Sequence, residues 1–164
     1  MPRSSPKDRL GTSDPLARTY SVPMLRLNCT SGDFTIAVGE IGSVPWSSPA
    51  VYDTNSLWDQ GNPTVIDFKD APTMSYWLSW SINAQFGGGT VGYVWLDNDP
   101  AQVVDLWITS GLWTQSNFIF KIENGQTLRI TVDATAGGAT DVQAGATDRL
   151  YLSVHGIPGT ESRS

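Results

Sequence analysis

The clearest pattern in the chain is a strict alternation over residues 74–83. One set of alternate positions holds Met74, Tyr76, Leu78, Trp80 and Ile82, and the other holds Ser75, Trp77, Ser79, Ser81 and Asn83. Successive side chains of a β-strand point to opposite faces of the sheet, so this pattern predicts a half-buried strand. The second face consists mainly of hydroxyls with one indole. Because it is neither charged nor fully apolar, we expect another protein surface, such as a second subunit, to cover it.

The same strand pattern recurs at intervals of roughly ten residues, separated by turn-forming residues. No segment has helical periodicity over three turns, so the pattern predicts an all-β protein, either a β-sandwich or a jelly roll. Loops are expected at 39–49 and 134–147, and a tight Asn-Gly turn at 123–126. The other predicted strands are 24–29, 34–38, 51–58 (a short edge strand), 64–68, 91–96, 103–108, 118–122, 128–133 and 150–155.

The two ends of the chain differ from this central region. Residues 1–22 are rich in Pro, Ser and Arg and poor in apolar residues, so we expect an extended N-terminal arm before a jelly-roll domain at 23–158 and a flexible tail at 159–164. The arm is either a frayed terminus without a role or a docking segment that orders on a partner. In the docking interpretation the contact residues are Arg3, Lys7, Arg9, Leu10, Leu16, Arg18 and Tyr20.

Composition narrows the function classes. Charged residues make up 16% of the 164 residues, below the roughly 25% of an average soluble protein, which favours protein-covered surfaces as much as a sandwich with Ser/Thr/Asn-rich faces. The net charge is −6, and residues 1–22 hold four cations against two carboxylates. The body is therefore acidic, which argues against nucleic-acid binding. No apolar run reaches the roughly 18 residues of a membrane span, and no secretory signal opens the chain, so we expect synthesis in a cytosol without export by the general route.

Candidate chemistry is sparse. The single cysteine, Cys29, allows no intrachain disulfide and is expected to be a buried, inert thiol. The single histidine, His155, has no Gly-x-Ser-x-Gly nucleophile motif to serve, so we expect a structural histidine or one near a subunit axis. The segment Asp97–Pro100 offers oxygen ligands for calcium, but turn formation explains the same residues. The triplet Gly87–Gly89 is interpreted as a hairpin tip, not a phosphate loop, because no Lys-Ser/Thr follows it.

We therefore expect no catalytic residues, no metal and no cofactor, although paired carboxylates of a glycosidase remain an alternative. The seven Trp and five Tyr residues also raise the question of carbohydrate binding, because sugars stack on exposed indoles. Most of these aromatic residues lie within predicted strands and are expected in the core or in an interface. The loop residues Trp46, Trp58 and Trp113 are the candidate ligand contacts.

Five stretches, taken in order, carry a resemblance to one family. They are Pro23-Met24-Leu25-Arg26-Leu27, Trp46 with Tyr52-Asp53-Thr54 and Leu57-Trp58-Asp59, Asn62 to Phe68 followed by Ala71 to Trp80, Phe118 to Ile130, and Leu150 to Ile157. Together they resemble virion-borne jelly rolls related to the complement globular-head and tumour-necrosis-factor-like fold, which implies an antiparallel β-sandwich of jelly-roll topology. The resemblance covers 23–158, with Ala71-Pro72 where the family usually has Gly and Gln126 where it usually has an acid.

This resemblance implies a homotrimer whose aromatic-bearing strand faces pack around a threefold axis. It also implies a non-enzymatic virion protein of a tailed bacteriophage, a capsid decoration or head fibre that the arm anchors to the major capsid protein or another virion protein. The alternative is a tail or surface adhesin that binds host cell-wall glycan. The expected trimer-interface residues are Tyr76, Trp77, Trp80, Tyr93, Trp95, Phe118, Phe120, Tyr151 and His155.

Overall fold

The structure is a computed structural model that describes residues 22–29, 33–47, 50–82, 84–85, 90–97, 99, 102–109, 114–135, 139–142 and 150–161. The seven docking residues predicted in the arm, the triplet Gly87–Gly89 and Trp113 lie outside these residues. Within the described ranges, no helix is long and apolar enough to cross a membrane.

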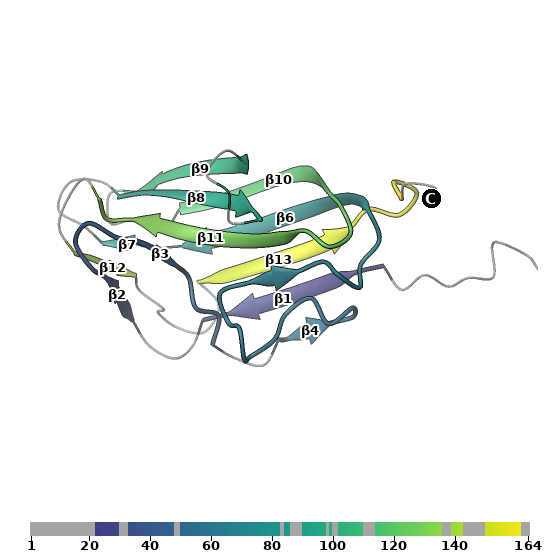
Figure 1. Ribbon diagram of the computed structural model, residues 1–164, viewed down its shortest axis with the longest axis horizontal. Helices are drawn as coiled ribbons and strands as arrows, with labels where there is room; N and C mark the ends of the chain where they lie inside the picture. Colours follow the sequence, from purple (N-terminus) through teal and green to yellow (C-terminus); the bar gives the residue numbers. More distant parts are fainter. Residues whose placement is uncertain are drawn as a thin grey trace, which may run out of the picture.

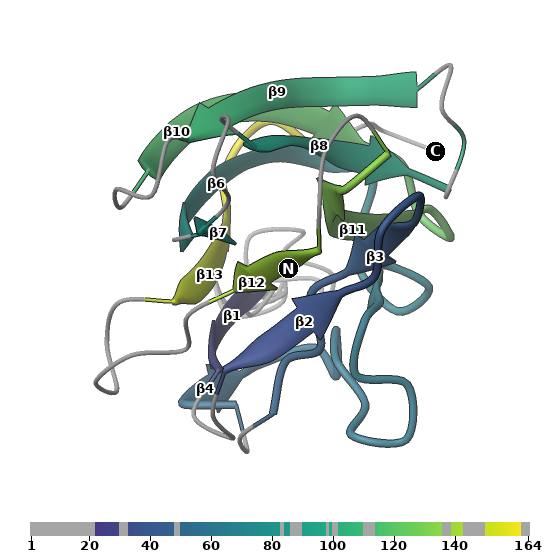
Figure 2. The ribbon, with the colours of Figure 1, turned by 90° about the vertical axis from the view of Figure 1, so that its left-hand side faces the viewer.

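The described strands form two main antiparallel sheets that pack face to face (Figures 1 and 2). The first sheet has the order β10-β6-β13-β1-β4, and the second has the order β3-β11-β8-β9 with β5 beside β11. Their strands are β1 (Met24–Asn28), β4 (Tyr52–Asp53), β6 (Met74–Ile82), β10 (Thr114–Ile122) and β13 (Tyr151–Gly156) in the first sheet, and β3 (Ile41–Ser43), β5 (Ile66–Asp67), β8 (Thr90–Leu96), β9 (Val103–Thr109) and β11 (Thr127–Asp133) in the second.

A small third sheet of order β2-β12-β7 closes one end of the sandwich (Figure 2). Its strands are β2 (Phe34–Ile36), β7 (Ala84–Gln85) and β12 (Thr140–Val142). On another side, β9 of the second sheet lies next to β10 of the first, which brings the edges of the two main sheets together (Figure 2). The prediction of an all-β antiparallel sandwich is confirmed.

Strand β6 has the two faces that the sequence predicted. Met74, Tyr76, Leu78, Trp80 and Ile82 are buried in the core, and Trp77 on the opposite face is half exposed. The Tyr76 hydroxyl donates a hydrogen bond to the carbonyl of Pro72 at 2.7 Å, and burial raises the pKa of this hydroxyl above its ordinary value of about 10. Strand β6 therefore forms the centre of the core.

Two segments that were predicted to be loops contain strands. The expected loop 39–49 includes β3, which pairs with β11 through Ile41–Asp133 and Ser43–Thr131. The expected loop 134–147 includes β12, which pairs with β2 and β7. Each strand has only three residues, so the alternation is too short to stand out, and both depend on partners distant in the sequence.

The Asn-Gly turn at 123–126 is present, and Gly125 has a φ of 87°, which glycine adopts without strain. It joins β10 of the first sheet to β11 of the second, so it crosses the sandwich instead of closing a hairpin. The Asn124 amide donates to the carbonyls of Lys69 at 2.7 Å and Ala71 at 2.8 Å. These bonds attach the crossing turn to the segment that precedes β6.

Candidate functional site

The most distinctive surface of the described chain is the face of the first sheet that points away from the second sheet. Strand register places Met24 opposite His155, His155 opposite Trp77, and Trp77 opposite Ile119, across β1, β13, β6 and β10. Residues in register on neighbouring antiparallel strands lie on the same side of the sheet. We call this set the apolar row: Met24, His155, Trp77 and Ile119.

The apolar row is exposed to an unusual degree for its chemistry. Trp77 is 50% exposed and Ile119 is 65% exposed, and Met24 is also exposed. These three belong to a set of only seven exposed large hydrophobic residues in the described chain. A contiguous exposed apolar patch marks a binding surface more often than isolated exposed residues do. The row is therefore the best candidate for a subunit contact.

The polar atoms around the row are already arranged by contacts within the sheet. The ring of His155 lies between two aromatic rings: its Nε2 is hydrogen-bonded to the Tyr52 hydroxyl at 3.0 Å, and the Trp77 ring centroid is 6.2 Å away. Tyr52 comes from the edge strand β4, which confirms the predicted short edge strand within 51–58. A histidine held in this way needs no reorganisation when a second surface packs on it.

Two and four residues further along the strands, the same face becomes polar. The Arg26 guanidinium lies 3.8 Å from the centroid of the Tyr151 ring and donates to Ser153 Oγ at 2.9 Å. The Tyr151 hydroxyl is hydrogen-bonded to Ser79 Oγ at 3.3 Å. The face thus combines an apolar row with a stacked cation and hydroxyls, the mixture found in the core and rim of protein interfaces.

Of the predicted interface residues, the structure brings Trp77, Tyr151 and His155 together on this face. The predictions for Tyr76 and Trp80 are wrong, because both are fully buried inside the protomer and have no surface to offer a partner. They occupy the inward positions of the same strand that presents Trp77. The alternation separated the two faces correctly, but the predicted interface combined residues from both faces.

The remaining predicted interface residues lie elsewhere. Tyr93 and Trp95 are on β8 of the second sheet and so do not share a face with Trp77. Phe118 and Phe120 are half-buried and pack against the core on the inward side of β10. Sequence reasoning missed Met24, Tyr52 and Ile119. The sequence did carry a signal for Ile119: it lies between Phe118 and Phe120 in the same strand, so its side chain points to the opposite face.

The two predicted ligand contacts that the structure describes, Trp46 and Trp58, do not form a site. Trp46 is buried in the core, so its assignment as a sugar contact is wrong. Its backbone N–H donates to the Pro63 carbonyl, which holds this loop against the body. Trp58 is partly buried, and its indole N–H donates to the same carbonyl at 3.3 Å, as expected of a structural side chain. Val44 and Trp46 are two residues apart and both buried, and this spacing was the sequence signal that the segment after β3 enters the core.

The Asp97 carboxylate, which was considered for calcium binding, and the Asp67 carboxylate accept hydrogen bonds from turns in the structure. Asp97 accepts hydrogen bonds from the backbone N–H of Thr127 at 2.8 Å and from the Gln126 amide at 3.1 Å. Asp67 accepts from the backbone N–H of Lys69 at 2.9 Å. Among the residues that the structure covers, no group of three or more His, Cys, Asp or Glu side chains could hold a metal ion.

The fold itself is shared with solved structures. Murine APRIL matches with a TM-score of 0.61 at 11% identity, over 83% of this chain and 99% of that one. Eiger TNF from S. frugiperda matches with a TM-score of 0.62 at 10% identity, over 87% and 97%. The globular domain of the zebrafish complement 1qA protein matches with a TM-score of 0.57 at 11% identity, over 83% and 97%.

The chain therefore has the jelly-roll fold of tumour-necrosis-factor and complement C1q domains. At these identities the likeness shows the fold alone. No protein-family model and no curated protein matches the sequence.

Proposed function

We propose that this chain is a non-enzymatic structural protein of a tailed-bacteriophage virion, a homotrimeric capsid decoration or head-fibre protein that residues 1–22 anchor to the major capsid protein or another virion protein. The observation that carries the trimer is the apolar row on the outward face of the first sheet. Domains with the tumour-necrosis-factor and C1q fold typically form homotrimers and typically lack enzymatic activity, which supports both parts of the proposal. The virion assignment rests on the sequence resemblance.

The apolar row supports self-association because a second copy supplies a matching surface. Three protomers around a threefold axis bury Trp77 and Ile119 against one another, which removes from water the apolar area that a lone protomer exposes. Tyr52 and His155, already hydrogen-bonded, provide a preorganised polar element beside the row. The second sheet, on the opposite side of each protomer, stays free in such a trimer.

The arm supports an anchoring role through its charge. Residues 1–22 carry a net charge of +2. Because the whole chain carries −6, the remaining residues carry −8. A basic segment on an acidic body favours an acidic partner surface. Three arms on one trimer also raise the effective concentration for the second and third contacts, so weak individual contacts hold the trimer firmly.

The test is a truncation that removes residues 1–22. Sedimentation velocity should show the truncated protein as a trimer of the same stoichiometry as the full chain. It should fail to bind phage particles assembled without this protein, whereas the full chain binds them. Binding of the truncated trimer to such particles would refute the anchoring role, and a monomeric full chain at micromolar concentration would refute the trimer.

A further inference from the structure

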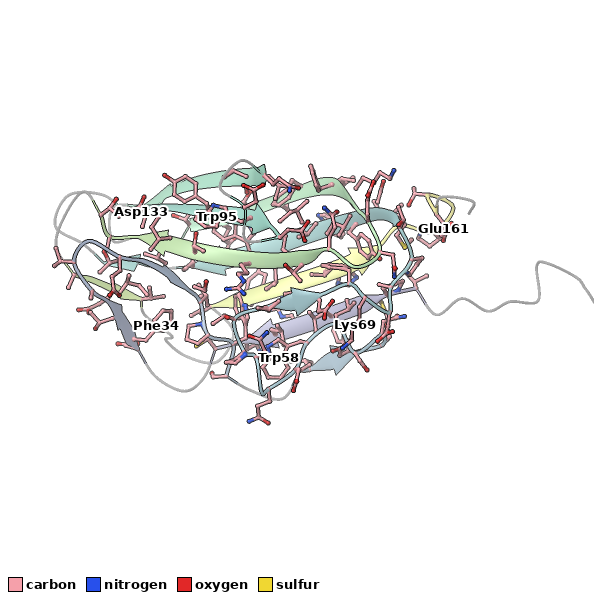
Figure 3. The ribbon with its side chains drawn as sticks, viewed as in Figure 1. Phe34, Trp58, Lys69, Trp95, Asp133 and Glu161 are labelled. Atoms are coloured by element: carbon pink, nitrogen blue, oxygen red, sulfur yellow. The ribbon has the colours of Figure 1, made fainter. Side chains whose placement is uncertain are left out.

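A second surface of interest is a pocket on the outward side of the second sheet. It has a volume of about 250 Å³ and is lined by Ile41, Tyr93, Trp95, Val103 and Asp133. Figure 3 shows Trp95 and Asp133 near each other on this sheet, over β8 and β11. The lining residues come from all four strands of the sheet order β3-β11-β8-β9.

Strand pairing explains why these five side chains meet. Ile41 is in register with Asp133, and Val103 is in register with Trp95, so each pair points to one side of the sheet. Tyr93 and Trp95 are two residues apart on β8 and share that side. The pairing of β8 with β9 also shifts register between Val94 and Trp95. Irregularities of this kind bend a sheet and re-aim side chains, and they are frequent beside binding sites.

The floor of the pocket is aromatic and its edges are aliphatic. The ring centroids of Tyr93 and Trp95 are 5.8 Å apart, with planes inclined by 40°. Ile41 and Val103 stand at opposite edges, and both are exposed. Together with the apolar row, they account for five of the seven exposed large hydrophobic residues of the described chain. Most of the exposed apolar side chains thus belong to two defined surfaces.

The polar group of the pocket is the Asp133 carboxylate, and it is fixed in place. Its Oδ1 accepts hydrogen bonds from the backbone N–H of Thr135 at 2.8 Å and from the Thr135 hydroxyl. From the residues that the structure describes, its Oδ2 accepts one long hydrogen bond, 3.5 Å, which the Tyr93 hydroxyl donates. Oδ2 therefore keeps acceptor capacity on the side of the pocket where Tyr93 lies.

We propose that this pocket binds a single pyranose ring of a neutral saccharide. A pyranose has an apolar C–H face that packs on aromatic rings, and hydroxyls around its edge that donate to a carboxylate. The Tyr93 and Trp95 rings supply the first surface, and Asp133 Oδ2 supplies the second. The volume is below the roughly 300–1,000 Å³ of typical small-molecule pockets, which suits one ring of a glycan chain.

The charge and the ring geometry of the pocket favour a neutral ligand. Asp133 repels a carboxylate-bearing sugar such as glucuronate. A quaternary ammonium ion, the other ligand that aromatic rings favour, would be attracted by Asp133, so geometry has to separate the two ligands. Two rings inclined by 40° form a platform and not the facing walls of a cation cage.

This proposal is independent of the trimer, because the pocket and the apolar row lie on different sheets. One pyranose in one pocket is expected to bind with a Kd on the order of 1 mM. If the chain forms the proposed trimer, three pockets lie on one assembly, and glycan chains bind to it more tightly than single sugars through multivalency.

The experiment is saturation-transfer difference NMR on the full chain with D-glucose, D-galactose and N-acetyl-D-glucosamine, and with glucuronate and choline as charged probes. At least one neutral sugar should receive saturation, and neither charged probe should. Saturation of choline without any neutral sugar would assign the pocket to a cation and overturn the proposal. Absence of saturation for all three neutral sugars would also overturn it.

Two variants place the signal in the pocket. Tyr93→Ala removes half of the aromatic floor, and Val103→Trp fills the pocket from an exposed edge without altering the core, so each should weaken sugar binding at least tenfold. The matched control is Val38→Trp, because Val38 is exposed and does not line the pocket. Unchanged binding by folded Val103→Trp would refute the site even if Tyr93→Ala failed to fold. A Trp77→Thr variant, whose change is on the other sheet, should keep wild-type sugar binding.

Discussion

Replacement of Trp77 by threonine tests the subunit contact most directly. Trp77 is half exposed in the apolar row, and among the described rings its indole lies near that of His155, with the ring centroids 6.2 Å apart and the planes inclined by 51°. Threonine is a strong strand former, and the neighbouring outward positions Ser75 and Ser79 already carry small hydroxyls. The substitution should therefore leave the protomer folded and remove the largest side chain of the proposed contact.

The size of the effect follows from the exposed area. A tryptophan side chain offers up to about 250 Å², and Trp77 is 50% exposed. Burial of that half, about 125 Å², stabilises the assembly by about 3 kcal/mol per protomer at 25 cal/mol/Å². A trimer contains three copies, so the association loses about 9 kcal/mol. Because the midpoint concentration of a monomer–trimer equilibrium varies as the square root of its dissociation constant, it should rise by up to roughly a thousandfold.

Sedimentation velocity across a concentration series measures this midpoint. The wild-type chain should be a trimer at micromolar concentration and the Trp77→Thr chain a monomer with unchanged circular dichroism. Val38→Thr, which removes a 63% exposed valine away from the first sheet, is the matched control and should stay trimeric. A Trp77→Thr protein that remains trimeric at the wild-type midpoint would show that the apolar row does not form the contact.

Two further predictions concern the body of the protein. Asn124→Ala should lower the free energy of unfolding by about 2 kcal/mol, because it removes the two short hydrogen bonds to the Lys69 and Ala71 carbonyls. Asn124→Asp cannot donate these bonds either, so it should lose as much stability. Urea denaturation measures both variants, and unchanged stability in both would contradict the role of the turn. Tyr76 is predicted to make stability pH-dependent in alkali. Burial raises the pKa of Tyr76 in the folded state, so the folded chain holds this proton more tightly than the unfolded chain. Stability is therefore complete below a pH of about 10 and falls as the pH rises above it. Absorbance titration of tyrosinate should show Tyr76 ionising only on unfolding, and Tyr76→Phe should flatten the decline; an equally steep decline in that variant would exclude Tyr76 as its cause.

Much of the fold could be predicted from local pattern. Every apolar position that the alternation in 74–82 assigns to the inner face of β6 is buried in the structure. The predicted strands at 24–29, 91–96, 103–108, 128–133 and 150–155 are also present, with ends shifted by a residue or two. This works because period-two patterning depends only on neighbours in the sequence. The short strands β3 and β12 were missed, because three residues carry too little pattern and distant partners hold them in place.

The surfaces were less predictable than the strands. Trp46 was taken as a loop side chain open to ligands, yet packing buries it completely. Trp95 and Trp77 look alike in the sequence, each an indole in a strand, but they belong to different sheets. No local pattern tells which sheet each of these two strands joins, because that depends on pairing between segments far apart in the chain.

The sequence by itself determined that this chain forms strands, which side of each long strand enters the core, and that one strand presents an indole on a polar face. Only the tertiary structure decided that Met24, His155, Trp77 and Ile119 form one row, and that Tyr93, Trp95 and Asp133 meet in one pocket. The physical reason is register. A shift of one residue between two strands would turn every side chain of a row to the other face, and hydrogen bonding between distant segments, which no local pattern encodes, sets that register.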